Sequence, residues 1–212
     1  WDIQPGSKKG IARAIAKAAS SPFGVGDAKY RYSEEASYVD TVPFGAYRKS
    51  TRLELGGFDE SLLTNEDYDL NVRLRRSGKK IWFDQKIRCT YFARSSLTAL
   101  AKQYWRYGYW KMRMLRKDPR SLRLRQLIPP LFVFSIPMLL IGQLFFSFFA
   151  TVISLELIAY IMGLTLIAIR AAGDENDLAL FWGMPVAISV MHFCWGSGFL
   201  WSLLTLSRKR KS

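Results

Sequence analysis

Histidine and cysteine are nearly absent from this sequence. Among its 212 residues there are two cysteines, Cys89 and Cys194, and one histidine, His192. Two cysteines in separate regions provide no disulfide framework, and with one histidine they do not make a zinc-site pattern. The sequence therefore excludes disulfide-stapled scaffolds and Cys/His zinc modules, and its free thiols suit a reducing compartment.

Charged residues are missing from a long C-terminal stretch. Residues 127–169 contain no Lys or Arg and one acid, Glu156. A bilayer is crossed by roughly 20 residues, so this stretch is long enough for two crossings joined by a turn near residues 149–154. One crossing after a bent segment is the alternative, because three prolines lie in its first half. Residues 178–206 predict a further span.

Polar and small residues inside these spans call for explanation. A histidine within a span is costly, so His192 is a candidate for contact with a lipid carrier. Gly196 and Gly198 are more typical of close packing between helices than of a binding site.

Positive charge is concentrated before the membrane region. The formal net charge is +14, and 26 of the 31 Lys and Arg residues precede residue 127. Lys and Arg next to spans are typical of cytoplasmic segments and attract anionic membrane lipid. A basic run with aromatic residues could also stack nucleic-acid bases, but the adjacent spans argue against nucleic acid as a partner. We expect a multi-pass cell-membrane protein whose polar part is cytoplasmic.

The charge pattern also predicts a topology. Residues 171–177 carry three acids, Asp174, Glu175 and Asp177, and residues 208–211 form a basic tail. By the positive-inside rule both chain ends lie in the cytoplasm and the acidic loop lies outside. This favours two full crossings, with residues 127–149 bent or interfacial.

A turn followed by a helix stands out between residues 56 and 80. Thr64 is the expected N-cap and Gly78 the expected end. At 3.6 residues per turn, Asp67 shares the inward face with Leu70 and Asn71. Two interpretations stay open for Asp67: it completes a capping box, or it is a general base at the mouth of a cleft.

A second helix is expected to begin at Ser95 or Ser96. Residues 115–126 after it are expected to form a basic linker. Gln103 and Arg106 are three residues apart and share a helix face, so both can reach one ligand. The alternative is an interfacial helix anchored by aromatic residues such as Tyr107.

The remaining polar part has mixed helix and strand patterns. Residues 7–19 predict an amphipathic helix and residues 20–26 a loop. Residues 38–44 predict a strand that ends at Gly45, where backbone can approach a substrate or simply turn. Strands at 80–84 and 86–92 would extend the sheet. The fold class is therefore α/β, followed by an α-helical transmembrane region.

The ordered set of these motifs, from Val39 through GGFDE and NEDYDLNVRLRRSGKKIWFD to Gly108, resembles family 2 glycosyltransferases. It is most similar to their membrane-bound, succinoglycan-type exopolysaccharide branch, over most of residues 20–126. The resemblance implies an inverting transfer from a nucleotide sugar to a lipid-linked or polysaccharide acceptor. It implies Asp67, of the Glu66–Asp67 pair, as the catalytic base, and Gly45 and Arg48 at the substrate. Residues 103–107 are similar to the Gln-x-x-Arg-Trp motif of the family, which implies that Gln103 and Arg106 hold the nucleotide diphosphate. The aromatic residue of that motif packs against the acceptor, and Tyr107 stands in its place.

The resemblance also sets expectations for the domains. Residues 1–94 correspond to the acceptor-side part of a GT-A-like domain, 95–126 to an interfacial helix and linker, 127–206 to two or three transmembrane helices, and 207–212 to a basic tail. We expect a C-terminal fragment, inactive alone, because no nucleotide-binding half with an Asp-x-Asp motif precedes Asp67. Asp67 and Asp69 are two residues apart on a helix and point roughly 200° apart, so we assign no metal ligand here. The cofactor implied is Mg²⁺ or Mn²⁺, held mostly by the other half.

Two classes of function follow from these patterns. The first is a membrane glycosyltransferase of exopolysaccharide or cell-envelope glycan synthesis. The second is a non-catalytic, membrane-anchored scaffold or lipid-binding module whose basic surface docks on anionic lipid.

Overall fold

The computed structural model describes residues 2–208, with side chains described to residue 205. Most of the expected basic tail therefore lies outside the described residues. The elements are, in chain order, β1 (Asp2–Gln4), α1 (Gly10–Ala19), α2 (Pro22–Val25), the 3-10 helix η1 (Lys29–Arg31), β2 (Ser37–Val39), α3 (Lys49–Glu54), α4 (Glu66–Arg76), β3 (Ile81–Phe83), β4 (Thr90–Phe92), α5 (Leu97–Lys117), the 3-10 helix η2 (Pro119–Ser121), α6 (Leu124–Gly142), α7 (Ser147–Glu175) and α8 (Leu178–Arg208).

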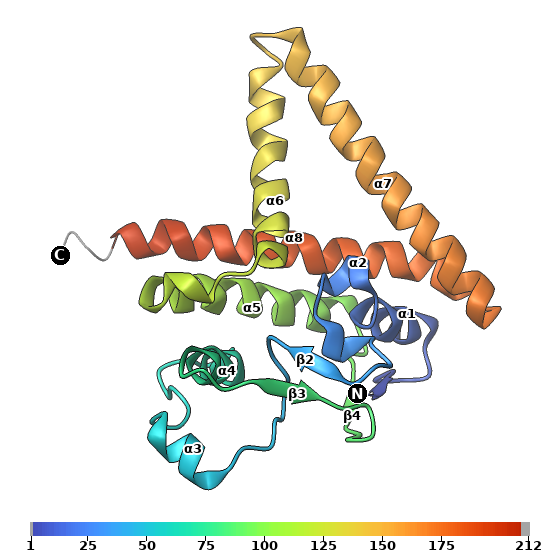
Figure 1. Cartoon of the computed structure of the whole chain (residues 1–212). Coiled ribbons are helices and arrows are strands. Elements are labelled where there is room, and N and C mark those ends of the chain that lie inside the picture. The colour runs from blue at the N-terminus through green and yellow to red at the C-terminus, as the bar shows by residue number, and fades with distance from the viewer. Residues whose placement is uncertain (1, 209–212) are drawn as a thin grey trace.

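The molecule is mostly helical and is arranged in three levels (Figure 1). The strands with α3 and α4 form the lowest level, α5 and α8 run side by side above them, and α6 and α7 form a hairpin that projects away. The strands expected at 80–84 and 86–92 are present in shorter form, as β3 and β4. They do not extend one sheet, however, because β1 pairs with β4 in parallel and β2 with β3 in antiparallel fashion, giving two separate sheets.

The main core lies where α1, α5 and α8 meet. The amphipathic pattern of residues 7–19 is confirmed, since α1 buries Ala14, Ile15 and Ala18. These pack with Leu100 of α5 and with a set of apolar residues on α8: Leu180, Met184, Ala187, Ile188 and Met191. The expected loop at residues 20–26 contains the short helix α2, which begins at Pro22, a residue suited to the first turn of a helix.

The start of α4 differs from the sequence prediction. Thr64 is not the N-cap, because its hydroxyl donates to the carbonyl of Leu63. Asn65 takes the N-cap position with a φ of 71°, a left-handed conformation that asparagine tolerates better than most residues. The helix thus begins at Glu66, and Ser96, as expected, caps α5 by accepting from the backbone N–H of Ala99.

Glycines allow α5 and α8 to approach backbone to backbone. A Cβ at Gly108 of α5 would lie 2.1 Å from the carbonyl oxygen of Trp195, and one at Gly198 of α8 would lie 2.3 Å from that of Trp105. A Cβ at Gly196 would lie 2.6 Å from the carbonyl oxygen of Pro129 on α6. The packing role predicted for Gly196 and Gly198 is confirmed, and α8 is fixed against both α5 and α6.

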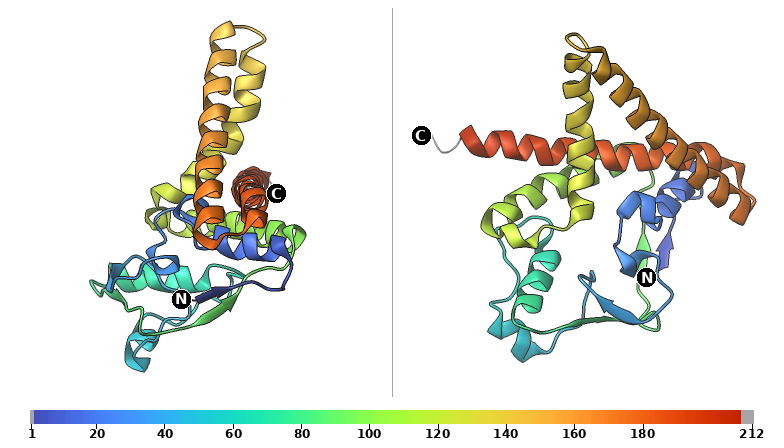
Figure 2. Two further views of the ribbon diagram at one scale, coloured as in Figure 1. Left: turned by 90° about the vertical axis from the view of Figure 1, so that its right-hand side faces the viewer. Right: turned by 45° about the horizontal axis from the view of Figure 1, so that its top comes forward.

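In the part of the chain that the structure describes, three helices are long and apolar enough to cross a membrane: Leu124–Gly142, Ser147–Glu175 and Leu178–Thr205. Helix α6 continues through its three prolines, so the expected bend in residues 127–149 is not found. The turn between the first two helices lies at residues 143–146, not at 149–154. Figure 2 shows α8 running across the base of the α6–α7 hairpin rather than alongside it.

The acidic loop after α7 lies against the polar part, which contradicts the predicted topology. Arg13 of α1 pairs with Asp177 at 3.0 Å, and Lys17 pairs with Glu175 at 2.6 Å. The cations that neutralise this loop come from more than 150 residues away in sequence, so a count of charges beside each span does not include them. The two ends of the α6–α7 hairpin therefore both lie on the side of the molecule that carries α1.

This arrangement predicts an accessibility pattern. In a background without Cys89 and Cys194, an impermeant maleimide added to intact cells should label a cysteine at Phe145, which is 74% exposed at the hairpin tip. It should label a cysteine at Asn176 only after the membrane is opened. Labelling of the Asn176 position alone in intact cells would instead support the loop-outside topology.

A second prediction concerns the α5–α8 contact. Gly108→Ala should destabilise the detergent-solubilised protein by about 1–3 kcal/mol, because the added methyl meets a backbone carbonyl that cannot rotate away. Gly173→Ala is the matched control, since nothing lies within 4 Å of its Cβ position near the end of α7. It should be neutral or stabilise by up to about 1 kcal/mol. Equal effects of both changes on thermal unfolding would show that the contact is not tight.

Candidate active site

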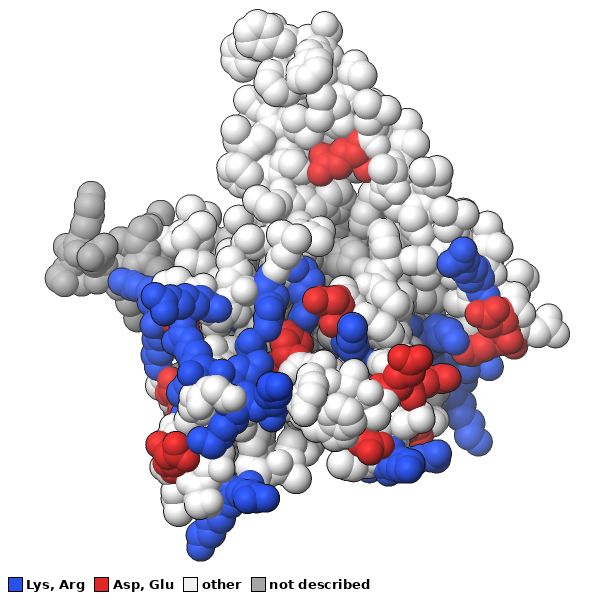
Figure 3. Space-filling model, viewed as in Figure 1, with Lys and Arg blue, Asp and Glu red and all other residues white. Residues whose placement is uncertain are grey.

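A cavity of about 1060 Å³ lies between the polar part and the hairpin. Its walls come from α2, η1, the start of α4, one face of α5 and the inner faces of α6, α7 and α8. Figure 3 shows Lys and Arg spread over the polar part below an almost uncharged hairpin. The cavity therefore joins a charged region to an apolar one.

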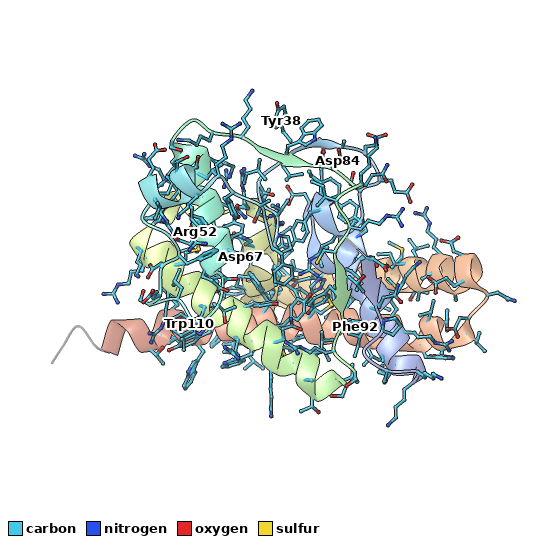
Figure 4. All side chains as sticks on the ribbon, turned by 90° about the horizontal axis from the view of Figure 1, so that it is seen from below. Tyr38, Arg52, Asp67, Asp84, Phe92 and Trp110 are labelled. Atoms are coloured by element: carbon cyan, nitrogen blue, oxygen red, sulfur yellow. The ribbon has the colours of Figure 1, made fainter. Side chains whose placement is uncertain are left out.

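Asp67 lies in the first turn of α4 and lines this cavity. Figure 4 shows it near the centre of the molecule, whereas Tyr38 and Asp84 lie at the periphery. Its Oδ1 accepts from the backbone N–H of Tyr68 at 2.7 Å. Burial raises the pKa of Asp67, and the charge of Glu66 adds to the rise, although the bond from Tyr68 opposes it. Both Asp67 and Glu66 line the cavity, and Glu66 is the more exposed.

Asp69 faces a different environment, as its position on the helix requires. Its carboxylate pairs with Arg73 at 2.8 Å, one turn further along α4. Arg73 in turn donates to the carbonyls of Leu55 and Gly57, which fixes the glycine turn before α4. Asp69 is not among the cavity-lining residues, so the two aspartates of Asp-Tyr-Asp do not face one common site.

Asn71 anchors the segment around Gly45, where the backbone was expected to approach a substrate. It is fully buried, at 0% exposure. Its amide nitrogen donates to Thr41 Oγ1 at 2.9 Å and to the carbonyl of Val42 at 2.8 Å, and its oxygen accepts from the hydroxyl of Tyr47 at 2.8 Å. Residues 41–47 are thereby held against α4, and Pro43 and Phe44 reach the cavity wall.

Gly45 and Arg48 do not line the cavity. A Cβ at Gly45 would lie 2.8 Å from the hydroxyl of Tyr47, so the glycine leaves room for the tyrosine that bonds to Asn71. Arg48 is exposed at the N-terminus of α3. Gly45 therefore lies within the segment 41–47 and Arg48 directly follows it, and neither lines the cavity.

Helix α5 brings three expected residues to the same cavity as Asp67: Gln103, Arg106 and Tyr107. The Gln103 amide donates to the Tyr107 hydroxyl at 2.7 Å and to the Tyr91 hydroxyl at 2.9 Å. Arg106 is exposed, with a 3.5 Å contact to the carbonyl of Leu63. Gln103 is therefore held in place, and most of the Arg106 guanidinium is available to a ligand.

The site contains a buried cation that the sequence reading missed. Lys111 is 1% exposed, donates to the carbonyl of Ser121 at 3.0 Å and lies 4.1 Å from the centre of the Tyr68 ring. Burial, followed by the charge of Arg125, lowers the pKa of Lys111 to about 7. The sequence does carry a signal for its burial: Lys111 comes seven residues after Tyr104, which places both on the inward face of α5.

The described residues contain no group of three His, Cys, Asp or Glu side chains that could hold a metal ion. The residues present thus offer no ligand set for the expected Mg²⁺ or Mn²⁺.

Comparisons with known proteins bear out the resemblance. The chain is 27% identical over 203 residues to the succinoglycan biosynthesis protein ExoA of Rhizobium meliloti, covering 93% of this chain and 58% of that protein. It is 26% identical over 195 residues to the dolichyl N-acetyl-alpha-D-glucosaminyl phosphate 3-beta-D-2,3-diacetamido-2,3-dideoxy-beta-D-glucuronosyltransferase of Methanococcus voltae, covering 92% and 56%. No family model matches the chain, and no solved structure matches it significantly.

The chain thus spans a little over half the length of the curated relatives it matches. Their names place these relatives in polysaccharide and lipid-linked glycan synthesis. With more than 90% of the chain covered, the similarity includes both the polar part and the long apolar helices.

The burial of Asp67 has a consequence for stability. A carboxyl whose pKa is raised in the folded state destabilises the fold when it is ionised, so Asp67→Asn should raise the melting temperature at pH 7. This gain should shrink as the pH falls through the raised pKa and the native carboxyl becomes neutral. Asp69→Asn is the control and should lower the melting temperature at pH 7, since it breaks the pair with Arg73. A lower melting temperature for both variants would show that Asp67 is not strained by burial.

Proposed function

We propose that this chain forms the acceptor side of an inverting membrane glycosyltransferase. The enzyme transfers a sugar from a nucleotide-sugar donor to a lipid-linked or polysaccharide acceptor in exopolysaccharide or cell-envelope glycan synthesis. The observation that carries the proposal is that Asp67 of α4 lines the same cavity as Gln103 and Arg106 of α5. The two glycan-synthesis relatives support it.

In this proposal Asp67 is the general base. Its carboxylate takes the proton of the acceptor hydroxyl as that oxygen forms a bond to C1 of the donor sugar. The bond from C1 to the diphosphate oxygen breaks on the opposite face, and the diphosphate leaves with the electron pair. A raised pKa makes Asp67 a stronger base than an exposed aspartate, and Glu66 beside it contributes to that rise.

Helix α5 supplies the diphosphate contacts in the same proposal. Arg106 offers a planar fork of N–H donors to the leaving diphosphate, and Gln103 adds an amide. Tyr107 lies beside Gln103 on the acceptor side. Gly45 and Arg48 act through the segment 41–47, which borders the cavity. No step is assigned to a metal ion, because the described residues contain no group of three His, Cys, Asp or Glu side chains that could hold one.

The proposal extends to fold and location. The polar part corresponds to the acceptor half of a GT-A-like domain and lies on the cytoplasmic face, where nucleotide sugars are made. Its Lys and Arg residues contact anionic lipid headgroups.

Asp67→Asn tests the assigned base. In membranes that contain the natural full-length protein, transfer from labelled nucleotide sugar into glycan should fall by about 10²–10⁴-fold, because the step that takes the proton is lost. Asp69→Asn should retain transfer, since Asp69 does not face the cavity. Activity of Asp67→Asn within about threefold of the wild type would rule out Asp67 as the base.

Arg106→Lys tests the diphosphate contact. The substitution keeps the charge but removes the planar fork, so kcat/KM for the nucleotide sugar should fall by roughly tenfold or more. Arg113→Lys on the same helix is a matched control, because Arg113 bonds to Tyr109 and does not line the cavity. Unchanged kinetics for Arg106→Lys would leave α5 as an interfacial anchor only.

A further inference from the structure

Helix α8 has two sides of different character. On one side, a Cβ at Gly183 would lie 2.7 Å from the Cβ of Ala14 on α1. On the same side, a Cβ at Gly198 would lie 2.3 Å from the carbonyl oxygen of Trp105 on α5. The polar part therefore holds α8 closely along this side. The other side carries large apolar residues that are 46–74% exposed, which we call the α8 stripe: Leu178, Trp182, Val186, Trp201 and Leu203.

The α6–α7 hairpin stands on the striped side of α8. The ring of Phe193 on α8 lies 5.6 Å from that of Phe132 on α6. A Cβ at Gly196 would lie 2.6 Å from the carbonyl oxygen of Pro129, also on α6. Positions 182, 186, 193, 196 and 203 advance in steps of three, four or seven residues, which keeps them on one helix face. The α8 stripe therefore faces the direction in which the hairpin projects, and Figures 1 and 2 agree that the hairpin stands across α8.

The opposite side of α8 is tied to a helix that carries charge along its length. Helix α5, which runs beside α8, has four exposed cations: Lys102, Arg106, Arg116 and Lys117. The first and the last are about 22 Å apart along the helix axis. If α8 crossed the bilayer, α5 would cross beside it and carry these cations into the hydrocarbon region, where charge is costly. The hairpin would then lie flat, so the packing opposes a transmembrane α8 although its length and composition permit one.

We propose that α8 lies along the membrane surface on the side of the polar part, with the α8 stripe inserted at the boundary between lipid headgroups and acyl chains. Of the three long apolar helices in residues 2–208, α6 and α7 then cross the bilayer and α8 does not. Trp182 and Trp201 lie toward the two ends of the stripe, and tryptophan is enriched in this interfacial layer. The cations of α5 reach the headgroups from the polar side.

The occupant of the α8 stripe is lipid rather than a second copy of the chain. The stripe lies at the base of a hairpin whose outer faces expose apolar side chains such as Phe134, Met138 and Ile161, and these need lipid around them. Residues 178–205 contain no Asp, Glu, Lys or Arg, so this helix offers no ion pair that would orient a protein partner. The placement uses packing alone and does not depend on the proposed reaction.

The test measures how deep spin labels on α8 lie in the bilayer. Full-length protein without its native cysteines is reconstituted into vesicles of phosphatidylcholine and phosphatidylglycerol, and one introduced cysteine is labelled at a time. Accessibility to oxygen and to a water-soluble nickel chelate gives the depth. Trp182→Cys, Val190→Cys and Leu203→Cys should report the same shallow depth to within about 5 Å. A helix that crossed the bilayer would carry position 190, near its middle, about 12 Å deeper than position 182.

Labels on α7 are the matched control. Phe148→Cys, near the start of α7, and Ile158→Cys, ten residues later, replace exposed side chains and should differ in depth by about 10 Å or more. A difference of that size between Val190→Cys and Trp182→Cys would show that α8 crosses the membrane and would overturn the proposal. Immobilised α8 labels that neither reagent reaches would also overturn it, because a protein surface would then cover the stripe.

A second measurement asks on which side of the membrane α8 ends. In intact cells an impermeant maleimide should not label Thr205→Cys, near the C-terminal end of α8, whereas it should label Phe145→Cys at the hairpin tip. Labelling of Thr205→Cys in intact cells would place this end of α8 on the far side of the membrane and would overturn the proposal.

Discussion

The contact between α5 and α8 at Gly108 and Gly198 is the constraint on which the rest of the structure depends. At each glycine a Cβ would lie within 2.4 Å of a carbonyl oxygen of the other helix, so the two helices cannot carry side chains there. Helix α5 holds Gln103 and Arg106, and α8 holds His192 and forms one wall of the cavity. The close approach therefore fixes the face of α5 that the cavity presents to Asp67.

Hydrogen bonds around α4 fix the other side of the cavity. Asn71 satisfies both donors and its acceptor inside the protein, and Arg73 ties Asp69 to the glycine turn before α4. Asn65, at the start of α4, donates to the carbonyl of Tyr107 on α5 at 3.3 Å. Asp67 is thus carried on a helix that is held at its start by Asn65 and near its middle by Asn71 and Arg73. Such fixed positioning lowers the reorganisation that a reaction would require.

Local periodicity predicted the helices and their inward faces well. The 3.6-residue repeat placed Asp67 beside Leu70 and Asn71, and the glycines of α8 were correctly assigned to packing. Two of the predictions that failed depended on contacts between residues far apart in sequence. The side of the acidic loop is set by Arg13 and Lys17, and the division into two sheets is set by β1 pairing with β4, more than 85 residues later. Lys111 was missed because a lysine among aromatic and basic residues is usually solvated, whereas here it is buried by Tyr68 and η2.

The central claim is that Asp67 acts as a base within a cavity it shares with α5. The most direct measurement is the pH dependence of kcat/KM for transfer, compared between the wild type and Asp67→Glu. The account predicts a loss of rate on the acid side, at a pH above the ordinary range of an aspartate because burial raises the pKa of Asp67, and a different midpoint in Asp67→Glu. An acid-side midpoint that is the same in both proteins would contradict the claim.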